Sequence, residues 1–169
     1  GECATRLDNS NRGTERQSNR KKLSKKDGKI LVAEDDNVSR RLAHRMLTNA
    51  GYNVLLAKDG EEAIEVYKEH RSEITLILMD VQMPRLDGLH ATQRIRTLEA
   101  EAMGELGDFD LPNEDELPII ALSAGAMKGD EERGLAFGMT DYLTKPLNRK
   151  LLLATLESYH SKEEGEGGI

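Results

Sequence analysis

The sequence predicts one α/β domain in which five parallel strands form a doubly wound sheet covered by five helices. Five short apolar runs alternate along the chain with five segments of helical periodicity. Residues 74–79 are β-branched or aliphatic, which is typical of a parallel strand buried on both faces. This run ends at an acid, Asp80, and three other runs also end beside charged or hydroxyl side chains. Because parallel strands end at the same edge of a sheet, we expect these side chains to meet there.

The size and composition are those of an ordinary globular domain. With 169 residues, 37% hydrophobic and 33% charged, the chain can bury one normal core. No apolar run approaches the ~20 residues needed to cross a bilayer, so we expect no membrane contact by this segment and a cytoplasmic location. A parent protein could still be anchored in a membrane. The single cysteine, Cys3, cannot form an internal disulfide, which fits a reducing compartment.

The charge is divided unevenly along the chain. Residues 1–29 hold nine Lys/Arg and four acids, a local +5, so the remaining residues carry −12 to give the total of −7. Such an acidic body argues against nucleic acid as a partner. We interpret residues 1–28 as a disordered basic linker, 29–160 as the folded domain and 161–169 as a flexible tail. The missing initiator Met and the long linker lead us to expect a piece of a longer protein.

The first strand and helix carry the first acidic cluster. The strand, residues 30–33, runs directly into Glu34, Asp35 and Asp36. Asn37 is the expected cap of the helix and Gly51 its stop. The apolar side chains with helical spacing are Val38, Leu42, Met46 and Leu47.

The second strand and helix follow the same rhythm. Residues 52–57 form the expected strand, and Asp59 with Glu62 has the form of a capping sequence. The third strand, residues 74–80, then leads into a loop over residues 83–88 and a helix through Leu89, Ile95 and Leu98. The second helix is expected to bury Ala63, Ile64, Val66 and Tyr67.

Residues 99–117 interrupt the alternation. They contain eight acids and no basic residue, so we expect a long, mobile acidic loop whose acids lack internal cations. A fourth strand over residues 117–122 ends at Ser123, and a helix follows over residues 128–137. The fifth strand, 141–144, is followed at once by Lys145 and Pro146. Asn148 is the expected cap of a last helix that ends near His160 and carries Leu151, Leu152, Leu153 and Leu156.

The strand ends together predict a phosphate-handling site. Glu34, Asp35 and Asp80 would meet at one edge, and three carboxylates cannot crowd together without a cation. Mg²⁺ suits carboxylate ligands and commonly shares its site with phosphate. Lys145 would offer a point charge to a phosphoryl oxygen, and the Ser123 hydroxyl would donate to another. One carboxylate supported in this way is a nucleophile that would form an aspartyl-phosphate.

Five motifs in order make the chain resemble the receiver domain of two-component response regulators over about residues 29–160. The motifs are Ile-Leu-Val-Ala-Glu-Asp-Asp at 30–36, Leu-Met-Asp-Val-Gln-Met-Pro at 78–84, Asp-Gly at 87–88, Ile-Ile-Ala-Leu-Ser-Ala at 119–124 and Tyr-Leu-Thr-Lys-Pro at 142–146. The resemblance implies a flavodoxin-like fold with strand order 2-1-3-4-5. Asp-Val-Gln-Met-Pro and the Glu-Asp pair look most like receivers attached to hybrid sensor histidine kinases.

The resemblance also implies roles at the acidic edge. Asp80 would be the phospho-acceptor. Asp35 and Asp80 would bind Mg²⁺ directly, Gln82 would offer its backbone carbonyl, and Glu34 would bind through a water. Glu34 stands where many members have Asp, and its longer reach favours that water-bridged role.

The remaining implied roles concern the later strands. Ser123 and Tyr142 resemble a switch pair that would reshape the face made by the fourth helix, fifth strand and fifth helix after phosphorylation. Lys145 resembles the family lysine, followed by a cis peptide to Pro146. Ser123 stands where Thr is commoner, a change that keeps the hydroxyl.

The expected function is Mg²⁺-dependent acceptance of a phosphoryl group from a histidine kinase or histidine phosphotransfer protein, by a monomer. The domain would catalyse its own phosphorylation and dephosphorylation, but the chain contains no Gly-rich nucleotide box of a kinase. A hybrid-kinase receiver is the favoured parent, and a stand-alone regulator is the alternative. A haloacid-dehalogenase-type phosphatase would need a second acid where Gln82 stands, and a phosphorylation-deficient pseudo-receiver would be expected to lack Asp80, Asp35 or Lys145.

Overall fold

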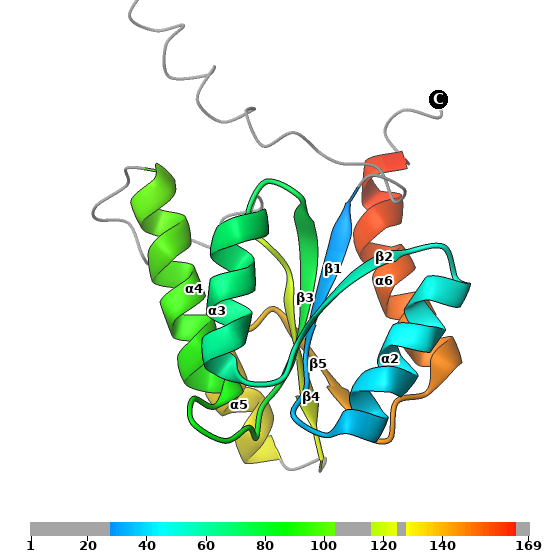
Figure 1. Cartoon of the computed structure of the whole chain (residues 1–169), viewed down its shortest axis with the longest axis horizontal. Coiled ribbons are helices and arrows are strands. Elements are labelled where there is room, and N and C mark those ends of the chain that lie inside the picture. The colour runs from blue at the N-terminus through cyan, green and yellow to red at the C-terminus, as the bar shows by residue number, and fades with distance from the viewer. Residues whose placement is uncertain (1–27, 104–115, 125–127, 165–169) are drawn as a thin grey trace, which may run out of the picture.

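The computed structural model describes residues 28–103, 116–124 and 128–164 and shows one five-stranded parallel sheet (Figure 1). The strand order β2-β1-β3-β4-β5 confirms the predicted doubly wound fold. Strands β3 and β4 are buried along almost their whole length, in line with their unbroken apolar sequences. The strands are β1 (Lys29–Ala33), β2 (Asn53–Ala57), β3 (Ile74–Asp80), β4 (Ile119–Ser123) and β5 (Asp141–Thr144).

Five helices cover the two faces of the sheet: α2 (Asn37–Asn49), α3 (Gly60–His70), α4 (Gly88–Met103), α5 (Lys128–Ala136) and α6 (Arg149–Glu164). In Figure 1, α2 and α6 lie on one side and α3, α4 and α5 on the other. Alternate side chains of each strand serve the two layers, so Ile30 packs with Leu47 and Leu156 while Leu31 packs with Tyr67 and Ile95. Within the described residues, no helix combines the length and apolarity that crossing a bilayer requires.

Helix α2 begins one residue earlier than predicted, and of its four predicted apolar residues Leu47 is buried and Met46 packs against the core while the other two face outward. Its cap is Asp36, whose side chain accepts from the Ser39 amide at 2.9 Å, so the prediction of Asn37 was wrong. Val38 and Leu42 have the spacing of a buried row, yet they are 74% and 44% exposed. The buried row is Ala43 and Leu47, which has the same i, i+4 spacing. Spacing alone therefore did not reveal which row faces the sheet.

The glycine predicted to end α2 and the acid predicted to cap α3 are both confirmed. Gly51 has φ +92° and follows the end of α2, and Asp59 caps α3 by accepting from the Glu62 amide at 2.8 Å. Gly60 lies against the loop after β3, where its amide donates to Leu86 O at 3.2 Å. A Cβ at Gly60 would lie 2.3 Å from that carbonyl oxygen, so only glycine permits this close contact.

The edges of the predicted acidic loop are structured, which corrects part of the sequence reading. Helix α4 continues to Met103, and Glu99 is buried. Arg96 lies 2.8 Å from the Glu99 carboxylate and 3.9 Å from that of Glu116, so these two acids do have an internal cation. Arg96 was missed as their partner because it lies outside the acidic segment. Residues 104–115 lie outside the described part of the chain.

The same arginine joins three segments. Its guanidinium donates to Leu117 O at 2.8 Å, to Gly138 O at 2.9 Å and to Thr140 Oγ1 at 3.3 Å. Glu99 accepts from the Leu117 amide at 2.8 Å. The pair thus fixes α4 to the start of β4 and to the turn before β5, with both side chains largely removed from water.

The end of the chain is close to the prediction. β5 has the predicted bounds, and Asn148 caps α6 by accepting from the Lys150 amide at 2.9 Å. α6 continues to Glu164, beyond the expected end near His160. Residues 1–27 and 165–169, most of the expected linker and tail, are outside the described residues.

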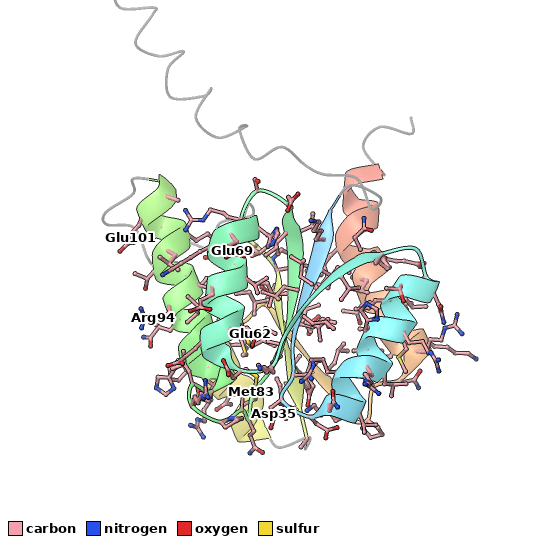
Figure 2. All side chains as sticks on the ribbon, viewed as in Figure 1. Asp35, Glu62, Glu69, Met83, Arg94 and Glu101 are labelled. Atoms are coloured by element: carbon pink, nitrogen blue, oxygen red, sulfur yellow. The ribbon has the colours of Figure 1, made fainter. Side chains whose placement is uncertain are left out.

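We expect Arg96→Met to lower the free energy of unfolding by about 3 kcal/mol, because it leaves a buried Glu99 carboxylate without its cation. Urea denaturation followed by circular dichroism measures this loss. Arg94→Met is the matched control, since Arg94 is exposed on the outer side of α4 and points away from the fold (Figure 2). Equal stabilities for the two variants would contradict the role of Arg96.

Candidate functional site

The register of the central strands brings the predicted residues to one edge of the sheet. Ala33 of β1 pairs with Met79 of β3, so Glu34 and Asp80 follow from neighbouring strands at the same level. Asp80 in turn pairs with Leu122, the residue before Ser123. The loops after β1 and β3 lie at the bottom of Figure 2, where Asp35 is labelled.

A single lysine bridges two of the acids. Lys145 Nζ lies 2.7 Å from Glu34 Oε2 and 3.0 Å from Asp80 Oδ2. Glu34 and Asp80 are almost fully buried, whereas the Lys145 side chain is partly exposed. Asp80 Oδ1 also accepts from the Gln82 amide at 3.2 Å. The structure thus places Asp80, Glu34 and Lys145 together as the sequence predicts.

Burial dominates the electrostatics of Asp80. Removal from water raises the pKa of Asp80 to about 7, the hydrogen bond from Lys145 opposes this rise, and the charge of Glu34 adds to it. Partial burial lowers the pKa of Lys145, but its hydrogen bonds to Glu34 and Asp80 outweigh that effect and leave the pKa raised. Lys145 therefore remains charged while Asp80 carries a proton in part of the molecules near neutral pH.

The acid cluster suits a divalent cation. Carboxylate oxygens of Glu34, Asp35 and Asp80 lie within 4.8 Å of one another. Three carboxylates and one ammonium leave two negative charges if all are ionised, which a divalent ion would balance. Glu34 Oε2 lies 2.7 Å from Lys145 Nζ, and no other group of the described residues donates a hydrogen bond to it. These oxygens therefore fit a hard cation such as Mg²⁺, with Asp35 exposed towards solvent.

The loop after β3 is held against the strand end by a glycine. A Cβ at Gly88 would lie 2.0 Å from Asp80 O, so another residue would push α4 away from the site. The Gly88 amide donates to Val81 O at 3.1 Å and closes the loop. Gln82 approaches Asp80 through its amide, and the ligand role expected for its carbonyl stays a prediction.

Ser123 and Tyr142 lie on neighbouring strands but differ in burial. Ser123 is buried at the end of β4, and its carbonyl accepts from the Lys145 amide at 2.7 Å. Tyr142 is 37% exposed on β5. A cavity of about 60 Å³ adjoins Tyr142, and its other lining residues are Ala121, Gly134, Leu135, Met139, Thr140 and Asp141. The peptide between Lys145 and Pro146 is cis, as the resemblance implied.

Sequence reasoning missed one side chain at the site. Arg40, on the first turns of α2, donates from Nη1 to Glu34 O at 3.0 Å. It looks like an ordinary surface arginine in the sequence. The only available signal was its position one helical turn after the acidic cluster, on the side of the helix that faces back towards it.

Comparison with known proteins identifies related sequences. Residues 30–157 match the family model described as a response regulator receiver domain. The chain is 43% identical over 133 residues to hybrid signal transduction histidine kinase I of Dictyostelium discoideum, covering 77% of this chain but 7% of that protein. It is 32% identical over 133 residues to the polar-differentiation response regulator DivK of Brucella anthropi, covering 77% of this chain and 94% of DivK.

Two solved structures share the fold. The receiver domain of a Pseudomonas aeruginosa sensor histidine kinase, with magnesium coordinated in its active-site cleft, is 36% identical with a TM-score of 0.64, covering 79% of this chain and 98% of that one. A Saccharomyces cerevisiae co-crystal structure holds the phosphotransfer protein Ypd1 and the receiver domain of Ssk1. That match has 28% identity and a TM-score of 0.70, covering 84% of this chain and 94% of the other.

The raised pKa of Asp80 predicts how the metal-free protein responds to pH. The folded protein holds this proton up to about pH 7, whereas the unfolded chain releases it near the ordinary value of 3.8. The free energy of unfolding should therefore fall as pH rises between these values. Asp80→Asn should lack this part of the slope and be more stable at pH 8 by about 1 kcal/mol or more. Urea denaturation in EDTA across pH 4–8 measures it, with the exposed Glu65→Gln as control. An unchanged slope in Asp80→Asn would assign the effect to other groups.

Proposed function

Because the chain belongs to the response regulator receiver family, we propose that Asp80 accepts a phosphoryl group from a phosphorylated histidine in a Mg²⁺-dependent transfer. One observation carries this assignment to Asp80. It is the buried carboxylate at the centre of the edge, 3.0 Å from Lys145 and grouped with the oxygens of Glu34 and Asp35. Of the other two acids, Asp35 is exposed, whereas Glu34 is buried and contacts Lys145 as Asp80 does. The choice of Asp80 over Glu34 therefore rests on the central strand β3 that carries it and on the resemblance of the motif Asp-Val-Gln-Met-Pro to the phospho-acceptor motif of the family.

In the proposed transfer, an oxygen of ionised Asp80 forms the new P–O bond while the P–N bond of the donor histidine breaks. The imidazole keeps the bonding electrons and takes a proton from solvent. Lys145 is already at Asp80 and can move its ammonium onto a phosphoryl oxygen. Its contact with Glu34 keeps it at the edge before the phosphoryl group arrives.

We assign the Mg²⁺ site to Asp35 and Asp80 as direct ligands, with Gln82 through its carbonyl and Glu34 through a water. Bound Mg²⁺ supplies positive charge that favours ionised Asp80 and offsets the phosphoryl oxygens. The magnesium in the Pseudomonas receiver and the convergence of three carboxylates here support the assignment.

The proposed docking face for the phosphate donor is the exposed side of α2. This helix carries three arginines, one histidine and no acid, in a chain with a net charge of −7. Val38 and Leu42 add an apolar strip beside Arg41 and Arg45, and the helix starts directly after the acidic loop of the site. An apolar helix surface edged with acids would match this face. We propose a histidine phosphotransfer protein or kinase domain as its occupant, by likeness to the Ssk1 receiver.

The expected switch remains part of the proposal. A phosphoryl group on Asp80 would draw the Ser123 hydroxyl towards its oxygens, because Ser123 ends the adjacent strand. Tyr142 is half-exposed beside a small cavity, so a shift of the chain after β4 would change its surroundings. A partner could then read the face made by α5, β5 and α6.

The parent protein is proposed to be a hybrid histidine kinase with this receiver in a cytoplasmic part. A hybrid signal transduction histidine kinase and a histidine kinase are among the curated relatives, and the chain spans 7% and 12% of the length of the Dictyostelium kinase and of Arabidopsis thaliana histidine kinase 1. DivK, which this chain covers over 94% of its length, represents the stand-alone alternative.

Incubation with acetyl phosphate and Mg²⁺ should add one base-labile phosphoryl group, and Asp80→Asn should add none. Intact-protein mass spectrometry measures the added mass. Asp87→Asn is a matched control, because it removes the charge of a partly exposed acid in the same loop, keeps an oxygen that can accept from the His90 amide and should still be labelled. Full labelling of Asp80→Asn would show that the acceptor is another residue.

If the phosphate donor docks on the exposed side of α2, a change on that side should slow phosphoryl transfer from a protein donor but not labelling by acetyl phosphate. Leu42→Glu should slow transfer from phosphorylated Ypd1 about tenfold or more, since it places an acid in the apolar strip, while acetyl-phosphate labelling stays within about twofold. Leu135→Glu makes the same change at an exposed site on α5 and should slow neither reaction. Equal effects of both variants on transfer would place the donor elsewhere.

A further inference from the structure

The carboxylate of Asp35 has no side-chain support of its own. It is exposed, lies in the loop between β1 and α2, and accepts no hydrogen bond from another described residue. Asp80, in contrast, is held by Lys145 and by the Gln82 amide. The direction of the Asp35 side chain therefore depends on the backbone of its loop.

That backbone is fixed from two sides. On the strand side, the Glu34 amide donates to Ala57 O at 3.0 Å. On the helix side, Arg40 donates from Nη1 to Glu34 O at 3.0 Å and, less closely, to Asp35 O at 3.4 Å. Its Nη2 donates to Asn37 Oδ1 at 2.9 Å, which holds the guanidinium plane in place. The two carbonyls that Arg40 binds are those immediately before and after the Asp35 amide and Cα.

We propose that Arg40 is a positioning residue for the cation site: its Nη1 bridges the carbonyls on both sides of Asp35 while its Nη2 is held by Asn37, and the planar guanidinium so points that carboxylate at Glu34 and Asp80. This inference rests on the Mg²⁺ site of the proposed function. Arginine is suited to the task because one rigid group donates in several directions at once, which a lysine ammonium on a flexible stem does not do. Groups that orient metal ligands typically affect metal affinity by about 10–100-fold.

Charge and geometry make opposite predictions for Arg40, and this makes the proposal testable. A guanidinium beside a cation site repels the cation, so its removal would by charge alone strengthen Mg²⁺ binding. If Arg40 positions Asp35, its removal weakens binding in spite of the lost repulsion. The sign of the change therefore separates a positioning residue from a bystander.

The experiment is a Mg²⁺ titration of the full chain without any phosphate donor, followed by the ¹⁵N–¹H amide shifts of Asp35 and Asp80. Arg40→Met keeps the length of the side chain and removes its donors, and we expect the Kd for Mg²⁺ to rise about tenfold. Arg40→Lys keeps the charge without the planar guanidinium and should also weaken binding, by a smaller factor. Lys58→Met is the control, because Lys58 is exposed, follows β2 at the same edge of the sheet and its loss also removes one positive charge.

Unchanged or tighter Mg²⁺ binding by Arg40→Met would overturn the proposal, and so would equal weakening by Lys58→Met. If Arg40→Met fails to fold, Arg40→Lys decides in its place, and wild-type affinity in that variant overturns the role of the guanidinium. Failure of the proposed function looks different. A wild-type protein that binds Mg²⁺ but is not labelled by acetyl phosphate would refute phosphoryl acceptance and leave the role of Arg40 intact.

Discussion

An excess of negative charge at the carboxyl edge of the sheet is the constraint on which the rest of the site depends. Three acids lie beside one lysine there, because the parallel pairing of β1 with β3 places Glu34 and Asp80 next to each other where the two strands end. Burial makes this costly, as the raised pKa of Asp80 shows. The two apolar layers on either side of the sheet supply the stability that offsets this cost, so the core serves the chemistry by holding together groups that repel each other.

The sequence allowed the strands and most of the site to be predicted because both depend on local order. An apolar run that ends on a polar residue marks the end of a strand, and parallel topology brings such ends together. Asp80, Glu34 and Lys145 were found in this way. A side chain of one element that binds the backbone of another produces no such pattern in the sequence, which is why the contacts of Arg40 and Arg96 were missed.

The errors have a similar cause. Asn37 and Asp36 are both good capping residues, and only the backbone decided between them. Val38 and Leu42 have the i, i+4 spacing of a buried row, but the row that contains Ala43 faces the sheet. Glu99 belongs by composition to an acidic loop, yet it lies buried against an arginine of the preceding turn. In each case two local solutions were nearly equal, and packing elsewhere in the fold selected one.

In the proposed function, helix α2 joins recognition of the phosphate donor to the chemistry of the acidic edge. Its N-terminal cap is Asp36, the residue directly after Asp35, its first turns hold the loop that carries Asp35, and its outer face is basic and apolar. A partner pressed against that face would bear on the same helix that shapes the acidic edge. In this proposal, partner binding and the reactivity of the acidic edge would be coupled directly, because α2 takes part in both.

The contacts of Arg96 have a consequence for how this domain can vary. They fix Glu99 on one side of residues 104–115 and Leu117 on the other, so the two ends of that segment are already held near each other. For a chain whose ends are pinned, added length costs only a logarithmic loss of entropy, about 0.6 kcal/mol for each doubling. Because the sequence predicts a mobile loop over this segment, we expect changes in its length to cost little stability, and the same position is a natural insertion point for a tag or sensor.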